Sequence, residues 1–127
     1  MKLYVGVTDN DWYRFLSQLP NVDEVNFWKP GGKVRFQALT PGEFFLFKLK
    51  GDTRIAGGGV FTHASLLPVS LAWEAFKEKN GASTFESMRT QIASLRSAPV
   101  GSHEDFQIGC VLIQQPIFLP EKMQCQA

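Results

Sequence analysis

Two apolar runs separated by a short turn set the architecture of this chain: Phe44-Phe-Leu-Phe-Lys-Leu49, then Gly51-Asp52, then Ile55-Ala-Gly-Gly-Gly-Val-Phe61. Phenylalanine, isoleucine and valine favour strands, and a glycine beside an aspartate favours a tight turn. The segment therefore predicts two strands that run antiparallel to each other. Glycine weakens a strand, so the run of residues 57–59 predicts a bulge or a place where a ligand approaches the main chain closely.

Other strands are expected on both sides of this hairpin. Residues 2–7 are short and apolar, and residues 25–28 and 34–36 flank a Pro-Gly-Gly turn that predicts a second hairpin or a tight loop between strands. Residues 106–113 predict a buried strand, which Pro116 is expected to break or to place at an edge.

Three segments carry apolar side chains at helical spacing. The first follows the capping side chains of residues 8–11, the second spans residues 68–76 with a stop at Asn80-Gly81, and the third begins at a capping box formed by Ser83 and Glu86. Their apolar faces comprise Trp12, Phe15, Leu16 and Leu19; Val69, Trp73 and Phe76; and Phe85, Met88, Ile92 and Leu95. The order of the elements predicts an α+β domain with a small, mostly antiparallel sheet or partial barrel.

The composition is that of one folded domain. The chain has 127 residues, 44% of them hydrophobic, and a formal net charge of +1, so no global charge excess drives it to nucleic acid or an anionic membrane. Residues 1–120 are expected to form the domain and residues 121–127 a flexible tail. No signal peptide or membrane-spanning segment is visible, which favours the cytoplasm, with Cys110 as a small, reduced core residue.

No catalytic or cofactor site stands out. His63 and His103 lie far apart, and neither has a partner at metal-ligand spacing, so no metal is expected. Neither glycine-rich segment continues into the Lys-Ser or Lys-Thr pair of a phosphate-binding loop, and no nucleophile motif occurs. Asp9 and Asp11 lie where a helix start favours negative charge. The chain therefore has no features of a complete enzyme, and no catalytic residue or cofactor is predicted.

Binding is better supported, because the charge is unevenly distributed. Residues 29–54 hold six basic residues against Glu43 and Asp52, which leaves a sum of −3 for the rest of the chain. The same region holds four phenylalanines and follows directly after Phe27 and Trp28. Cations attract phosphates and exposed rings stack on bases, which predicts a nucleic-acid surface. The alternative is that the cations line the solvent side of strands whose rings are buried.

Several longer stretches of the sequence together carry a resemblance to a known protein family. They are Val5-Gly-Val-Thr-Asp-Asn-Asp-Trp12, Glu24-Val-Asn-Phe-Trp28, Pro41-Gly-Glu-Phe-Phe-Leu-Phe-Lys48, Ala56-Gly-Gly-Gly59 and Leu67-Pro-Val-Ser-Leu-Ala-Trp-Glu-Ala-Phe76, followed by Phe85-Glu-Ser-Met-Arg89, Ile108-Gly-Cys110 and Gln115-Pro116. Together they resemble the N-terminal domain of a bacterial family of HNH-type restriction endonucleases. More loosely, the phenylalanine-rich strand and the glycine-rich return strand resemble the PUA-like group, which includes EVE, ASCH and SRA-type domains.

The resemblance implies a small, strongly bent β-barrel with peripheral helices, in a module that recognises DNA. Several PUA-like modules hold a flipped, chemically modified base between aromatic rings. In the endonuclease family a separate C-terminal domain with a His-Asn-His metal site cuts the DNA, and no matching residues occur here. The chain is therefore expected to be the DNA-recognition part of a modification-dependent restriction endonuclease, without the nuclease domain.

A pocket for such a base needs flat walls and polar groups for the base edge. The base-binding residues expected are Trp28 as one wall, Phe27 or Phe61 as the other, and Asn26, Asp9 and Asn10 at the edge. The phosphate-binding residues expected are Lys29, Lys33, Arg35, Lys48 and Arg54. The glycines of residues 57–59 would let a sugar or base approach the main chain.

Three alternatives stay open. The same surface could bind structured RNA, as other PUA-like modules do. The fold could carry a small hydrolase of modified nucleosides, as some ASCH-type domains do, although no Lys/Thr/Glu set aligns with that motif. The chain could also be a plain interaction module without a ligand, which burial of Trp28 would favour. A concave site lined by Trp28, with cations at its rim, would favour base capture.

Overall fold

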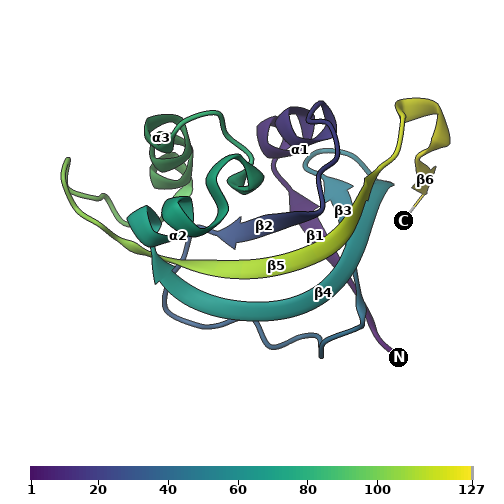
Figure 1. Ribbon diagram of the computed structural model, residues 1–127, viewed down its shortest axis with the longest axis horizontal. Helices are drawn as coiled ribbons and strands as arrows, with labels where there is room; N and C mark the ends of the chain where they lie inside the picture. Colours follow the sequence, from purple (N-terminus) through teal and green to yellow (C-terminus); the bar gives the residue numbers. More distant parts are fainter. Residues whose placement is uncertain (127) are drawn as a thin grey trace.

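Five strands of the chain form one continuous sheet in the computed structural model, which describes residues 1–126 (Figure 1). The strands are β1 (Leu3–Thr8), β2 (Glu24–Lys29), β3 (Phe44–Leu49), β4 (Arg54–Pro68) and β5 (Gln107–Phe118), and a short β6 (Cys125–Gln126) pairs with β4. Their order across the sheet is β1-β3-β4-β5-β2. The pair β1–β3 is parallel and the other pairs are antiparallel. The predicted α+β class and the mostly antiparallel sheet are confirmed.

The helices gather on one side of the curved sheet. They are α1 (Asn10–Ser17), α2 (Val69–Phe76) and α3 (Phe85–Leu95), with short 3-10 turns η1 (Lys77–Asn80) and η2 (Glu121–Met123). Figure 1 shows β4 and β5 as two long arcs with α1, α2 and α3 inside the curve. No helix within residues 1–126 is long and apolar enough to cross a bilayer.

Side-chain caps set where two of these helices begin. Asp9 caps α1, because its carboxylate accepts hydrogen bonds from the main-chain N–H groups of Asp11 and Trp12. The predicted capping box at Ser83 is wrong by one position. Thr84 is the cap of α3, and its hydroxyl accepts from the N–H of Ser87. A serine and a threonine stand side by side here, and the sequence alone did not distinguish them.

The strand predicted over residues 34–36 does not form, so neither the predicted hairpin nor the alternative of a tight loop between two strands is present. Residues 30–43 are an irregular connection, and β2 pairs instead with β5 from Glu24–Gln114 to Lys29–Gly109. The connection is held at its start by Arg96, whose guanidinium donates to the main-chain oxygens of Pro30 and Gln107. The long-range pairing buries all four central residues of β2, which a local hairpin would not do.

The end of the chain contains regular elements beyond Pro116. β5 continues past Pro116 to Phe118, because Gln115 adopts a positive φ of 52° and the register with β4 shifts at that point. Proline in a bulge donates no ladder hydrogen bond, so the strand can resume beyond it. The tail predicted to be flexible contains η2 and β6, the latter paired with Arg54 and Ile55, while residue 127 lies outside the described residues.

The glycines of β4 allow the neighbouring strands to approach its main chain closely. A Cβ atom at Gly57 would overlap the main-chain oxygen of Ile117 in β5, and one at Gly58 would lie 2.6 Å from the main-chain oxygen of Phe45 in β3. The protein's own backbone therefore fills the space that the sequence interpretation gave to a ligand. The bulge interpretation is confirmed, since the β4–β5 register shifts between Gly58 and Val60.

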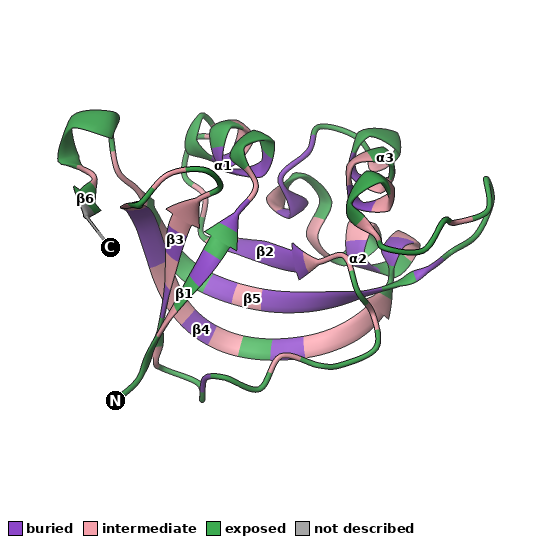
Figure 2. Cartoon of the chain, turned by 180° about the vertical axis from the view of Figure 1, so that it is seen from behind, coloured by how far each residue is buried: buried purple, intermediate pink, exposed green. Residues whose placement is uncertain are grey.

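Aromatic rings fill the space inside the curve. The rings of Phe27 in β2 and Phe45 in β3 are 4.6 Å apart between centroids, and Trp12 meets both Phe27 and Phe47 edge-on at 5.3 Å. These rings join β2, at one end of the sheet order, to β3, which lies next to β1 at the other end. Cys110 in β5 is buried among the core residues, as predicted. Figure 2 shows much of β5 in the colour of buried residues.

Candidate functional site

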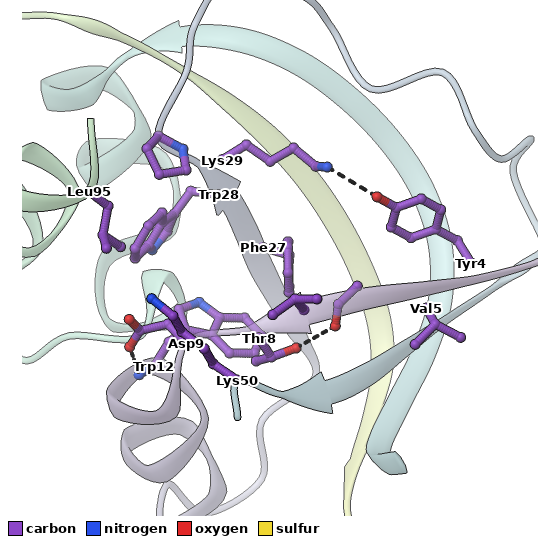
Figure 3. Close-up of a pocket in the computed structure, with 13 residues that line it drawn as sticks. Tyr4, Val5, Thr8, Asp9, Trp12, Phe27, Trp28, Lys29, Lys50 and Leu95 are labelled. Atoms are coloured by element: carbon purple, nitrogen blue, oxygen red, sulfur yellow. Dashed lines mark hydrogen bonds between the residues drawn. The ribbon is translucent and has the colours of Figure 1, made fainter. Parts of the chain in front are cut away.

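A cavity of about 510 Å³ lies between β1 and β2, the two strands at the ends of the sheet (Figure 3). This cavity is called the seam cavity below. One side of the cavity is formed by residues 4–8 of β1 and by Asp9, the cap of α1. The other lining residues are Trp12, Phe27, Trp28, Lys29, Pro30, Lys50 and Leu95. Its volume lies within the usual range of small-molecule sites, about 300–1,000 Å³.

Main-chain groups of β1 face this cavity. The carbonyl oxygen of Thr8 accepts a hydrogen bond from the N–H of Lys50, so the polar groups of Thr8 point toward β3. Main-chain polar groups alternate in direction along a strand, so those of Val5 and Val7 point the other way, along the unpaired edge. Val5 and Val7 line the cavity although much of their side-chain surface is exposed to solvent.

The opposite side of the cavity is also a strand edge. The carbonyl oxygen of Asn26 points away from β5, since it accepts a hydrogen bond of 3.1 Å from Nε1 of Trp12. By the same alternation, the main-chain N–H and C=O of Trp28 lie on this side of β2. Within residues 1–126, neither of these two strand edges pairs with another strand. Both face the same cavity, and each offers main-chain donors and acceptors to a bound molecule.

Aromatic side chains form the apolar part of the lining. Trp28 is mostly buried, with 7% of its surface exposed, and its Nε1 donates to the main-chain oxygen of Asn80 at 2.8 Å. Trp12 and Phe27 are buried as well. Figure 3 shows Leu95 beside Trp28 at one end of the cavity and Phe27 between Trp28 and Tyr4. Trp28 lines a concave site, but it does not stand out as an open stacking platform.

Asp9 supplies a carboxylate to the same cavity. Its Oδ1 is the atom that caps α1, and it also accepts a hydrogen bond of 2.7 Å from Nε2 of Gln91. Its other oxygen, Oδ2, makes no hydrogen bond within residues 1–126. Asp9 therefore combines a structural role through one oxygen with an available acceptor at the other.

Two lysines lie at the cavity. Nζ of Lys29 is 3.3 Å from the hydroxyl of Tyr4 and lies over the rings of Tyr4 and Phe36, at 5.4 and 5.3 Å from their centroids. Lys50 is exposed, at the turn after β3. The predicted cation Lys29 is thus at the site, while Lys50 was part of the basic segment but was not singled out.

The other predicted base-binding residues lie elsewhere. Asn26 is fully buried and does not line the cavity; its Nδ2 donates to Oδ1 of Asn80 at 2.9 Å, on the face of β2 that also carries Trp28. Its Oδ1 has no partner of ordinary hydrogen-bond geometry in the described part of the chain. Burial raises the pKa of the neighbouring Cys110 thiol, and Asn26 acts against that shift. Asn10 is exposed beside the cavity without lining it, and Phe61 lines a separate pocket with Arg35 and Phe36.

The remaining predicted phosphate contacts are dispersed. Lys33 and Arg35 are exposed in the connection between β2 and β3, and Lys48 is half-buried opposite Val7. Arg54 forms a two-pronged pair with Asp52, with Nη2–Oδ2 and Nε–Oδ1 distances of 2.8 and 3.1 Å. None of these four residues lines the seam cavity.

The sequence interpretation missed several residues that line the cavity. Trp12 and Leu95 were assigned to apolar helix faces, and the unpaired edge of residues 4–8 carried no signal because it offers main-chain atoms. The edge positions of β1 and β2 become visible only when the strand order is known. One continuous stretch of the sequence, Val5–Trp12, contains the edge of β1, the cap residue Asp9 and the indole of Trp12.

A comparison of the chain with protein-family models and with curated proteins gives no match. Within residues 1–126, no three His, Cys, Asp or Glu side chains group in a way that could hold a metal ion.

Proposed function

We propose that this domain binds DNA and holds one base, flipped out of the stack, in the seam cavity. The observation that carries the proposal is the position of that cavity between two unpaired strand edges, with tryptophan and phenylalanine rings beside them. Unpaired main-chain groups need hydrogen-bond partners, and the rings offer flat apolar surfaces. A nucleobase is flat and carries donors and acceptors along its edge, so it satisfies both demands.

The polar groups suggest how a base would be oriented. The main-chain groups of Val5, Val7 and Trp28 offer donors and acceptors, while Oδ2 of Asp9 is an acceptor only. A base with an exocyclic amino group could donate to that oxygen. We therefore favour cytosine-type or adenine-type bases, including their methylated forms, over thymine.

The resemblance of the sequence to the N-terminal domain of HNH-type restriction endonucleases supports the same function. In that setting the domain would report a modified base to a separate nuclease domain in a cytoplasmic protein. The bent sheet with helices inside its curve is compatible with a PUA-like barrel, and we propose that the seam cavity is the opening between β1 and β2 in such a barrel.

A second candidate is an interaction module that binds no base. The burial of Trp28 favours it, because this indole is held by Asn80 and exposes little surface for stacking. The two candidates differ in what they require of the cavity, since only base binding needs it to be open.

Titration of the chain with short DNA duplexes tests the proposal. One duplex would be unmodified, and the others would carry a single methylated or hydroxymethylated base. Because Trp12 and Trp28 both line the cavity, base capture should change tryptophan fluorescence. Binding should also weaken as salt rises, since phosphate contacts release counterions. Matched RNA duplexes should bind more weakly, and the reverse preference would support the RNA-binding alternative.

A variant that fills the cavity separates base capture from surface binding. Leu95 lines the cavity and is 40% exposed, so Leu95→Trp should block it without disturbing the core. Leu71 is 51% exposed on α2 and does not line the cavity, which makes Leu71→Trp the matched control. We expect only Leu95→Trp to remove the preference for a modified base. Equal binding by all three proteins, or no binding to any duplex, would contradict the proposal.

A further inference from the structure

We infer that a groove beside α1 holds the phosphate of the nucleotide whose base occupies the seam cavity; this rests on the proposed function. The groove, called the α1 groove below, has a volume of about 350 Å³. Its lining comes from α1 and from the turn between β3 and β4, and includes Asn10, Arg14, Lys50 and Asp52. Lys50 belongs to the basic segment of residues 29–54, but none of these four residues was named from the sequence as a phosphate contact.

The α1 groove and the seam cavity share Lys50. This residue lines both, so the two spaces meet at its side chain. A phosphate is separated from its base by one sugar, so it must leave the cavity close to where the base enters. Lys50 is the cation placed at that exit.

The main chain at Lys50 is fixed from two sides. Its N–H donates to the carbonyl of Thr8 at 2.9 Å, and its carbonyl accepts from Nδ2 of Asn10 at 3.4 Å. Its side chain is exposed, and within residues 1–126 its Nζ has no hydrogen bond or ion pair. Lys50 therefore has a fixed main chain and an ammonium group without a partner among the described residues, which suits it to bind an anion.

Arg14 provides the second cation of the groove. Its guanidinium is 3.6 Å from the carboxylate of Asp11, in a pair whose side chains are 69% and 77% exposed. Such an exposed pair contributes little, so the guanidinium can exchange its partner for a phosphate. Arginine also matches the geometry of phosphate oxygens through its parallel N–H groups.

The carboxylates near the groove do not cancel this charge. Asp52 is paired with Arg54 through two hydrogen bonds, so its charge is already compensated. The charged side chains that line the groove are the cations Arg14 and Lys50 and the carboxylate Asp52, which leaves a net charge of +1. That balance suits a phosphodiester, which carries a single negative charge.

Mononucleotides test this inference with the complete chain. The probes would be a panel of 2′-deoxynucleosides, plain and methylated, each with its 5′- and 3′-monophosphate, followed by tryptophan fluorescence. We expect at least one monophosphate to bind about tenfold more tightly than its nucleoside at low salt, and the difference to shrink as salt rises. Arg14→Gln should remove most of this difference and leave nucleoside affinity unchanged, because Arg14 does not line the seam cavity.

Lys33→Gln is the matched control, since Lys33 is an exposed cation that lines neither space. Equal affinity for nucleoside and monophosphate would overturn the inference and leave base binding intact. Loss of the phosphate gain in Lys33→Gln but not in Arg14→Gln would overturn it as well. Absence of binding for every nucleoside and nucleotide would instead show that the proposed function is wrong, and the inference would fall with it.

Discussion

Nε1 of Trp28 donates a hydrogen bond of 2.8 Å to the main-chain oxygen of Asn80, and this bond fixes β2 to the end of η1. Asn80 is fully buried, and its side chain continues the network by accepting from Asn26 and donating to the carbonyls of Ala72 and Lys77. The residue predicted from the sequence to hold a base is therefore first a structural connection between the sheet and the helices.

Trp28→Phe should lower the free energy of unfolding by about 1–3 kcal/mol, because it leaves the buried oxygen of Asn80 without its donor. Urea denaturation followed by circular dichroism would measure the change. Trp73→Phe is the control, since Trp73 is half-buried and its indole N–H makes no hydrogen bond in the described part of the chain. Equal losses in the two variants would show that ring size, and not the hydrogen bond, sets the stability.

Local patterns in the sequence were sufficient for most elements of the fold. The capping side chains before Trp12, the two apolar runs around Gly51-Asp52 and the stop at Asn80-Gly81 each depend on neighbouring residues, and the corresponding elements form. The pairing of β2 with β5 joins residues far apart in the chain, as in Val25 with Ile113, which are 88 positions apart, and no local pattern encodes it. The error at residues 34–36 follows from the same cause.

The residues of the candidate site also divide into those that local sequence patterns identified and those that depend on the tertiary fold. Asp9, Phe27, Trp28 and Lys29 reach the cavity because they lie near the ends of elements that the sequence identified. Asn26 does not, although it shares the face of β2 that carries Trp28, because it is fully buried and bonded to Asn80. Lys50 and Arg14 come together only because the turn after β3 lies beside α1, and this tertiary contact is not encoded by any local pattern.

The glycines of β4 should tolerate no side chain. Gly57→Ala would place a methyl group on the main-chain oxygen of Ile117, and backbone overlap of this kind cannot be relieved by a rotamer change. We expect it to lower the free energy of unfolding by about 3 kcal/mol, at the upper end of typical overpacking losses, or to prevent folding.

Gly31→Ala is the matched control for this prediction. Nothing lies within 4 Å of a Cβ at Gly31, and its φ is not positive, so its stability should change by only a few tenths of a kcal/mol. If the glycines instead served a ligand, Gly57→Ala would fold normally and lose only binding. Thermal unfolding of the two variants distinguishes these results.

The ion pair between Asp52 and Arg54 should make stability depend on acid pH. The two hydrogen bonds from the Arg54 side chain, with further help from its N–H and its charge, hold the pKa of Asp52 well below its usual range. The unfolded chain, with an ordinary Asp pKa near 4, takes up the proton first as the pH falls. The stabilisation is therefore fully present above about pH 5 and is lost progressively as the pH falls below 4.

Asp52→Asn removes this carboxylate and should flatten the dependence of the unfolding temperature on pH between about 5 and 3. Arg54→Gln should flatten it as well, because it removes the first cause of the lowered pKa. A slope that stays unchanged in both variants would show that the pair contributes nothing to acid stability.

Asp9→Asn gives the sharpest test of how a base would be recognised. Asparagine caps a helix about as well as aspartate, so its Oδ1 can keep the bonds to Asp11, Trp12 and Gln91, and stability should change by less than about 1 kcal/mol. The group left toward the cavity changes from an acceptor, Oδ2, to a donor, Nδ2. A base that donates an amino hydrogen at that point would lose its partner, and one that presents a carbonyl would gain one. The pair 5-methylcytosine and thymine differs at the exocyclic position in this way, so affinity for the first should fall about tenfold or more relative to the second. Duplexes with either base at one site, titrated against both proteins, measure the ratio.

Asp9→Ala is the control. It should weaken the binding of both bases and lower the free energy of unfolding by about 1 kcal/mol through the lost cap. An unchanged ratio in Asp9→Asn would mean that the carboxylate serves only to begin α1.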